Sequence, residues 1–198
     1  MVRIEGKRDK SRIYPQKNKG DDVKLSTEIK KCTVNDLEQI QNIAIETYNE
    51  TYSHLNTPEN MHDYLENAFS TAQLKKELDN EHSTFFLLLE NDAIAGYLKV
   101  NVDNAQTQQV SNENALEIER IYVKSNFQDR GLGRILLNKG IEIARDKNKH
   151  NVWLGVWNKN KTAIDFHKNM GFEVEGEYSV FVGDEEHVNY IMVKSLND

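Results

Sequence analysis

The chain contains very little cysteine and no long apolar run. Its single cysteine, Cys32, excludes an intramolecular disulfide and a cysteine-rich zinc site, and it suits a reducing compartment. The longest uninterrupted apolar run, Phe85 to Leu89, is far shorter than the roughly 20 residues of a membrane-spanning helix. No apolar signal-peptide core follows Met1. We therefore expect a soluble, cytoplasmic protein with no membrane partner.

The net charge is negative and unevenly distributed. The formal charge is −7, but residues 1 to 24 hold eight Lys or Arg against four Asp or Glu, which leaves residues 25 to 198 near −11. Such a surface repels nucleic acid and anionic lipid and attracts cations. The composition therefore predicts a cationic partner and no nucleic-acid partner.

Residues 1 to 24 differ from the rest of the chain in pattern as well. They mix charges with Gly6, Pro15 and Gly20 and show neither helical nor strand periodicity. This pattern is typical of a disordered lead or an artificial extension, and its basic charge of a solvated arm. Residues 25 to 198 contain no internal repeat and no linker, so we expect them to form one domain.

The periodicity of residues 26 to 198 predicts an α/β protein. We expect a strand over 26–31, a helix opened by Thr33 and Asp36 that ends near Tyr52, and a helical region over 58–79 that breaks near Ser70. A strand–helix–strand order later in the chain indicates a parallel pair joined by a right-handed crossover, so the sheet is expected to be mixed. The remaining expected elements are strands 85–89 and 94–102, a polar loop 103–114, strand 115–123, helix 131–147, strand 152–157, helix 160–170, and strands 172–182 and 187–194.

A glycine-containing turn, Gln128 to Arg134, joins the expected strand 115–123 to the helix that follows. Its two glycines let backbone N–H groups approach an anion, and the positive end of the helix points at the same place. The turn therefore predicts a pyrophosphate site, with charge added by Arg130 and Arg134, although glycines here can also serve the turn alone. Neither G-x-x-x-x-G-K-[ST] nor G-x-G-x-x-G occurs, which disfavours a P-loop nucleotidase and a dinucleotide-binding fold.

The residues around this turn resemble the acetyl-CoA site of the GNAT superfamily of N-acetyltransferases. Gln-x-x-Gly-x-Gly at 128–133 follows the strand 117–123, and Asn160-x-x-Ala163-Ile164 and Gly171-Phe172 come later. Five further segments resemble PaiA-type spermidine/spermine N-acetyltransferases: 45–47, 57–60, 94–97, 153–157 and 183–186. Together the resemblance spans roughly residues 25 to 198.

This resemblance implies both a fold and an activity. The implied GNAT fold has a mixed, mostly antiparallel central sheet with a parallel, splayed strand pair, flanked by helices. The implied reaction moves the acetyl group of acetyl-CoA to a primary amine of spermidine or spermine by direct attack in a ternary complex. No metal is implied, and a homodimer is left open.

The resemblance also assigns cofactor-binding residues. Backbone groups of Ile121 and Val123, on either side of Tyr122, would pair with the pantetheine arm like an added strand. Asn160 would contact the arm, or it could serve only as a helix N-cap. The turn that would hold the pyrophosphate comprises Gln128, Asp129, Arg130, Gly131, Leu132, Gly133 and Arg134.

Acetyl transfer to an amine needs two proton movements. An alkyl ammonium with a pKa near 10.4 must lose a proton, and the departing thiolate must gain one. Glu117 and Glu119 lie two apart on a strand and share one face, so they could act as base or hold the cation, unless they form a solvated face. His167 lies where the superfamily commonly has a tyrosine that protonates the thiolate. It could act as this acid, contact the sulfur, or be structural.

The first helix is expected to select the substrate. Glu46, Tyr48, Glu50 and Tyr52 offer carboxylates and aromatic faces to a polycation, although Tyr48 also fits the apolar stripe and the glutamates could only solubilise the helix. Two rival functions remain. One is acetylation of another amine, such as an amino acid, an aminoglycoside or a protein amino group. The other is a non-catalytic acyl-CoA sensor, motivated by the missing tyrosine.

Overall fold

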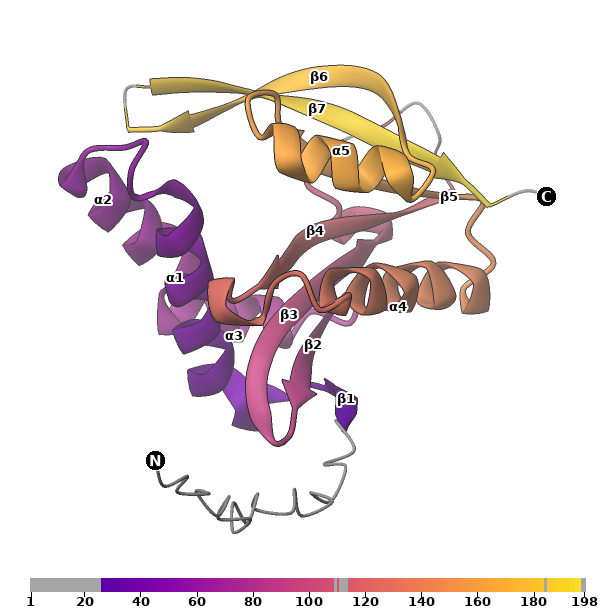
Figure 1. Ribbon diagram of the computed structural model, residues 1–198, viewed down its shortest axis with the longest axis horizontal. Coiled ribbons are helices and arrows are strands. Elements are labelled where there is room, and N and C mark those ends of the chain that lie inside the picture. Colours follow the sequence, from indigo (N-terminus) through magenta and orange to yellow (C-terminus); the bar gives the residue numbers. More distant parts are fainter. Residues whose placement is uncertain (1–25, 109, 111–113, 184, 197–198) are drawn as a thin grey trace, which may run out of the picture.

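The computed structural model describes residues 26–108, 110, 114–183 and 185–196, which form one seven-stranded sheet flanked by five α-helices (Figure 1). The strand order is β1-β2-β3-β4-β5-β7-β6. The expected lead, residues 1 to 24, lies outside the described residues. The elements are β1 (Thr27–Lys31), α1 (Leu37–Tyr52), α2 (Pro58–Phe69), α3 (Thr71–Leu78), β2 (Ser83–Glu90), β3 (Ala93–Val102), β4 (Ala115–Val123), α4 (Leu132–Asp146), β5 (Asn151–Trp157), α5 (Lys161–Asn169), β6 (Glu173–Val182) and β7 (Glu185–Ser195), with short 3-10 turns at Val34–Asp36, Asp103–Ala105 and Ser125–Phe127.

The sheet is antiparallel except where β4 meets β5. These two strands pair in parallel over three registered positions, from Ala115 opposite Asn151 to Glu117 opposite Trp153. Beyond Glu117 no β5 residue pairs with β4, so the two strands diverge, and the long helix α4 makes the crossover between them. The expected α/β class, mixed sheet and splayed parallel pair are therefore confirmed.

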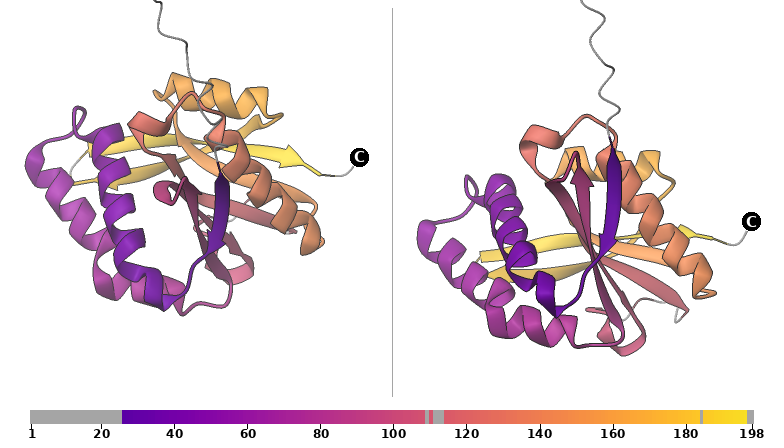
Figure 2. Two further views of the ribbon diagram at one scale, coloured as in Figure 1. Left: turned by 60° about the horizontal axis from the view of Figure 1, so that its bottom comes forward. Right: turned by 90° about the horizontal axis from the view of Figure 1, so that it is seen from below.

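Alternating residues of the strands bury two different faces. Phe85 and Leu87 of β2 pack with helices α1, α2 and α3, whereas Phe86 and Leu88 pack with α4. Figure 2 shows α1–α3 on one side of strands β1–β4 and α4 on the other. The sheet is therefore covered on both faces, and the two helical layers are built from distant parts of the chain.

Local chemistry explains where the helices begin. Thr33 and Asp36 form the expected capping box at the short turn that leads into α1, and the Thr57 hydroxyl accepts from Asn60 N–H ahead of Pro58 in α2. Ser70 ends α2 and caps α3. No described helix has the length and apolar character needed to cross a membrane.

Helix α4 lies unusually close to the sheet at one position. A Cβ added at Gly140 would lie 2.8 Å from Ile118 Cδ1, so a larger residue would force the helix away. Leu132 and Leu136 are buried beneath α4 as expected, while Ile143 is only partly buried at the edge of the same core. The close contact holds the second half of α4 against the middle of β4.

Candidate active site

A groove of about 760 Å³ opens where β4 and β5 diverge; we call it the splay groove. The N-terminus of α4 closes one end of it and α5 forms one wall. Most residues expected to bind the cofactor line this groove: Ile121, Tyr122, Val123, Gln128, Asp129, Gly131, Leu132, Gly133, Arg134, Asn160 and His167.

Backbone groups dominate the end of the groove at α4. Gly131 is the N-cap of α4 with φ of 79°, a left-handed conformation that favours glycine, and no side chain caps the first turn. A Cβ at Gly131 would meet nothing within 4 Å, so the position is open to a ligand. The first-turn N–H groups therefore remain available for an anion.

Three expected residues use their side chains within the protein. Gln128 Nε2 donates to the Val123 carbonyl at 3.0 Å. The Arg130 guanidinium lies 2.8 Å from Glu90 Oε2 and donates to the Asn126 carbonyl, and Arg130 does not line the groove. Asn160 Oδ1 accepts from Ala163 N–H at 3.1 Å, so Asn160 is a helix N-cap that also lines the groove. Arg134 is the arginine of this turn that lines the groove.

The groove fits acetyl-CoA on two structural observations. The uncapped turn at Gly131 offers N–H groups to a diphosphate. The edge of β4 beyond Glu117 has no paired strand on the β5 side, so an extended arm with amide groups can bind along Ile121 to Val123.

His167 lies at the wall of the splay groove on α5. The side chain is 5% exposed, and its Nδ1 has no hydrogen-bond partner among the described residues. The rings of Phe166 and Phe172 lie 5.1 and 5.9 Å away, and burial lowers the pKa of His167 to about 4. His167 is therefore neutral at pH 7, and its buried Nδ1 is an unsatisfied polar atom.

A second, smaller cavity of about 270 Å³ lies beside the splay groove; we call it the aromatic cavity. Tyr48 stacks on Tyr64 with ring centroids 4.3 Å apart, and Tyr52 meets Trp157 edge-on. Its aromatic lining is Tyr48, Tyr52, Tyr64, Phe69, Tyr122, Trp157, Tyr178 and His187. Aromatic faces of this kind attract alkylammonium groups.

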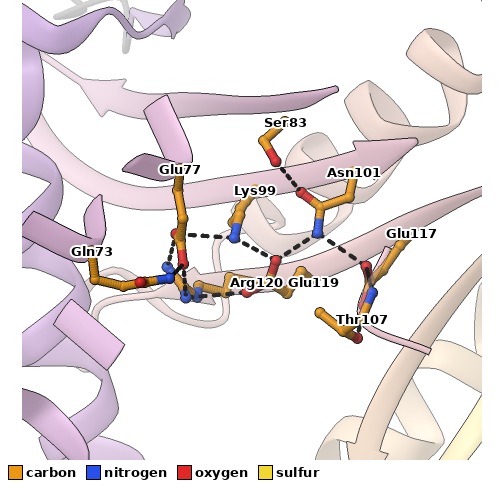
Figure 3. Close-up of polar contacts among 9 residues, drawn as sticks. All are labelled: Gln73, Glu77, Ser83, Lys99, Asn101, Thr107, Glu117, Glu119 and Arg120. Carbon is orange, nitrogen blue, oxygen red and sulfur yellow. Dashed lines mark hydrogen bonds and ion pairs between the residues drawn. The ribbon is translucent and has the colours of Figure 1, made fainter. Parts of the chain in front are cut away.

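Glu117 and Glu119 both line the aromatic cavity. Glu117 is 2% exposed, which makes the solvated-face interpretation of this residue wrong. Asn101 Nδ2 donates to Glu117 Oε2 at 3.0 Å and to Glu119 Oε2 at 2.5 Å, so one amide joins the two carboxylates (Figure 3). Thr107 donates to Glu117 from both its backbone N–H, at 2.8 Å, and its hydroxyl.

The two carboxylates have opposite pKa shifts. Burial and the neighbouring charge of Glu119 raise the pKa of Glu117 to about 6, against the opposing hydrogen bonds from Thr107 and Asn101. Burial also acts to raise the pKa of Glu119, but the charges of Arg120 and Lys99 outweigh it and lower the value. Glu119 is therefore a permanent anion near neutral pH, and Glu117 can take up a proton.

The four candidates on α1 are divided between the two cavities. Tyr48 and Tyr52 line the aromatic cavity. Glu50 lines the splay groove and accepts from the Ser125 N–H at 2.9 Å and from the Ser125 hydroxyl at 2.6 Å. Glu46 lines neither described cavity and forms an ion pair of 2.7 Å with Lys124. The two glutamates thus join α1 to the segment after β4.

The two cavities meet at one place. Tyr52, Glu119, Tyr122 and Gly155 line both of them. Two ligands, one in each cavity, would therefore meet with their inner ends beside Glu119 and Tyr122. Within the described residues, no group of three or more His, Cys, Asp or Glu side chains is placed to hold a metal ion.

Several residues of the aromatic cavity were not expected from the sequence. Three residues of β6 line it: Tyr178, Val180 and Val182. In the sequence they alternate with the polar Glu177 and Ser179, which was the available signal, but the apolar Phe181 interrupts the pattern. Arg120 also lines it. A β-bulge gives no such signal: Lys99 pairs with Arg120 and Val100 with Ile118, so Glu119 is the additional residue on β4.

Comparisons with known proteins agree with this geometry. The model of the "Acetyltransferase (GNAT) family" matches residues 37–172. An uncharacterized N-acetyltransferase from Lactobacillus delbrueckii subsp. lactis is 37% identical over 81% of this chain and 92% of its own. A spermidine N(1)-acetyltransferase from Thermoplasma acidophilum is 23% identical over 76% of this chain and 91% of its own.

Solved structures show the same fold. The PaiA N-acetyltransferase from Thermoplasma acidophilum, in complex with coenzyme A, superposes with a TM-score of 0.70 at 23% identity, covering 86% of this chain and 99% of its own. The family match spans more than half of the chain, and the Lactobacillus relative supports it independently. The chain therefore belongs to the GNAT family and is an acetyl-CoA-dependent N-acetyltransferase.

Proposed function

We propose that this protein transfers the acetyl group of acetyl-CoA to a primary amine of a polyamine, spermidine or spermine, by direct attack in a ternary complex. The observation that carries the proposal is the pair of carboxylates, Glu117 and Glu119, in a cavity with aromatic walls that joins the splay groove. The similarity to a spermidine N(1)-acetyltransferase supports this substrate class.

The charges of the aromatic cavity favour a polycation over an amino acid. Arg120 contacts both oxygens of Glu77, at 2.9 and 3.1 Å, and one oxygen of Glu119, at 3.1 Å. Its guanidinium is therefore already paired with carboxylates and is a poor partner for the carboxylate of an amino-acid substrate. The net charge of −7 also attracts a polycation over long range.

The cofactor would occupy the splay groove. Backbone N–H groups from Gln128 to Arg134 would hold the diphosphate, and Ile121 and Val123 would pair with the pantetheine arm. Arg134 would add a positive charge, whereas Arg130 acts through its ion pair with Glu90 to hold the turn.

Glu117 is the proposed base. Its raised pKa, about 6, lets it accept a proton from the substrate ammonium, and Glu119 stabilises the cation before that step. Acetyl-CoA supplies the acyl group: the amine nitrogen bonds to the carbonyl carbon and the carbon–sulfur bond breaks. The nitrogen then loses its second proton, the departing thiolate gains one, and CoA leaves as the thiol. Tyr52 and Tyr122 line the junction where the two substrates meet.

His167 is proposed to contact the sulfur as a neutral imidazole. With a pKa lowered to about 4, the imidazolium form is scarce at pH 7, so the residue acts by a hydrogen bond to the sulfur and not as a stored acid. If this is correct, His167→Tyr retains much more turnover than His167→Ala. Equal losses in both variants would remove His167 from the mechanism.

The release of CoA thiol tests the proposed substrate. The purified protein is assayed with spermidine, spermine, free amino acids, an aminoglycoside and a peptide with a free amino terminus. We expect the highest kcat/KM with spermidine or spermine at low salt. Preference for another amine would replace the substrate class, and CoA binding without turnover on any amine would favour the sensor.

We also propose a cytoplasmic location for the protein. Cys32 is buried and unpaired, and burial raises the pKa of its thiol to about 12, so the thiol is unreactive. A chain with one free cysteine needs no oxidising compartment. Separation of cell fractions with an antibody against the protein tests this location.

A further inference from the structure

A buried lysine, Lys99, forms ion pairs with Glu77 and Glu119 but lines neither the aromatic cavity nor the splay groove. Lys99 of β3 is 3% exposed, and its Nζ lies 2.9 Å from Glu77 Oε2 and 2.5 Å from Glu119 Oε2. Figure 3 shows Lys99 between these two carboxylates, with Arg120 on the far side of the same pair. Lys99 therefore connects helix α3 to the bulge of β4 that carries Glu119.

The two cationic side chains compensate only part of the acidic cluster. Three carboxylates, Glu77, Glu117 and Glu119, belong to the network, against Lys99 and Arg120. Lys99 and Arg120 both contact Glu77 and both contact Glu119. Glu117 receives only neutral donors, from Asn101 and Thr107. Because buried charges are stable only when paired, Glu117 is the carboxylate left without a cation.

We infer that Lys99 is a positioning residue for acetyl transfer: its ion pair with Glu119 fixes Glu117 as the carboxylate that takes the proton. This inference rests on the proposed function and goes beyond it by naming what distinguishes the two neighbouring carboxylates. The Asn101 amide joins them, so they form one coupled pair. In such a pair, the group with cationic partners stays charged and the other one is protonated first.

The substrate ammonium completes the same charge pattern. With all three carboxylates ionised, the network holds one negative charge more than its two cations, and an ammonium in the aromatic cavity would balance it. When Glu117 takes the proton, the cluster becomes neutral and the amine becomes a nucleophile. The other titratable groups that face this cavity from α1, α2, β4, β6 and β7 are Tyr48, Tyr52, Tyr64, Tyr122, Tyr178 and His187.

The direct test is a carbon-13 NMR titration of the Glu117 carboxyl in the free full-length protein, assigned by its loss in Glu117→Gln. Lys99→Met removes a positive charge, so the Glu117 midpoint moves up by about one pH unit. Glu119→Gln removes a negative charge, so the midpoint moves down by a similar amount. The double variant Lys99→Met/Glu119→Gln removes both charges and returns the midpoint close to that of the wild type.

Kinetics with the best amine substrate supply the second readout. In each variant, the apparent pKa on the acidic side of the pH profile of kcat/KM shifts with the NMR midpoint. Lys99→Arg keeps the positive charge, so its profile matches that of the wild type, unlike that of Lys99→Met. Midpoints that stay fixed in both single variants, or a midpoint of Glu119 that lies above that of Glu117, would overturn the inference. If Lys99→Met alone does not fold, the double variant is compared with Glu119→Gln. An upward shift of the Glu117 midpoint between these two variants then measures the effect of Lys99.

The NMR titration needs no substrate, so it separates this inference from the proposed function. Absence of polyamine turnover with the expected midpoint shifts would reject the polyamine as substrate and leave the proton order intact. Turnover of spermidine with unshifted midpoints would support the polyamine as substrate and reject the role of Lys99 in the proton order.

Discussion

The splay groove and the aromatic cavity share a boundary but are built in different ways. The groove recognises its ligand mainly through backbone: an uncapped helix start at Gly131 and an unpaired edge of β4. The aromatic cavity is built from side chains of α1, α2 and strands β4 to β7. Ligand binding to backbone groups tolerates substitution of the side chains around them. Binding in the aromatic cavity depends on the side chains that line it. Cofactor binding and substrate choice are therefore expected to respond to different substitutions.

Glu117→Gln is the sharpest way to separate the two regions. It removes the proposed base without changing the shape of the cavity, so turnover falls about a hundredfold to ten-thousandfold, while the affinity for CoA is unchanged. Steady-state kinetics and calorimetry of CoA binding measure both quantities on the same preparation. A variant that keeps most of its turnover would show that another group removes the proton.

Gly131→Val, in contrast to Glu117→Gln, is expected to weaken CoA binding. A side chain there has open space, so the effect comes from the φ of 79°, which costs a residue other than glycine about 1–2 kcal/mol. The turn leaves this conformation, and restoring it weakens CoA binding roughly tenfold. Gly176→Ala is the matched control, because its Cβ would meet Ile191 at an ordinary 3.7 Å. Equal CoA affinity in both variants would contradict a backbone-built site.

His167 tests how dry the inner wall of the groove is. Its folded-state pKa, about 4, lies below the unfolded value near 6.5, so its contribution to stability is complete above pH 6.5 and is lost as the pH falls toward 4. The shift corresponds to about 3 kcal/mol in the free energy of unfolding. Urea denaturation from pH 7 to pH 4 should show this loss in the wild type and not in His167→Phe. Parallel curves would mean that water reaches the imidazole.

The smallest expected effect concerns salt. If carboxylates and long-range charge attract the amine, the KM for spermidine rises about twofold to fivefold between about 0.05 and about 0.5 M salt. A monoamine of similar length, which carries fewer charges, should show a weaker dependence. Identical salt dependence for the two amines would assign recognition to the aromatic walls alone.

The same contrast explains what the sequence could predict. The element order, the parallel strand pair and the turn at residues 128–134 follow from local patterns: hydrophobic period, helix caps and two glycines after a strand. These are also the features that build the splay groove. In the sequence, the splay of the parallel pair is implied only by the resemblance to the GNAT superfamily. Of the residues expected to bind the cofactor, all but Arg130 line the splay groove, and Glu50, expected to select the substrate, lines it as well.

The aromatic cavity depends on contacts between residues far apart in the chain. The sequence places Glu117 and Glu119 on one face, but it does not show the bulge at Glu119 or the contacts that Lys99 and Glu77 make there. Glu46 has the charge to bind a polycation but pairs with Lys124 instead. Such pairings arise from tertiary packing, which no single-sequence period encodes.

The most direct test is a crystal structure of the protein with CoA and spermidine bound. We expect the diphosphate to lie on the backbone N–H groups of residues 128–134 and a primary amine of spermidine to lie within about 3 Å of Glu117 or Glu119. A diphosphate bound elsewhere, or spermidine bound outside the aromatic cavity, would contradict this expectation.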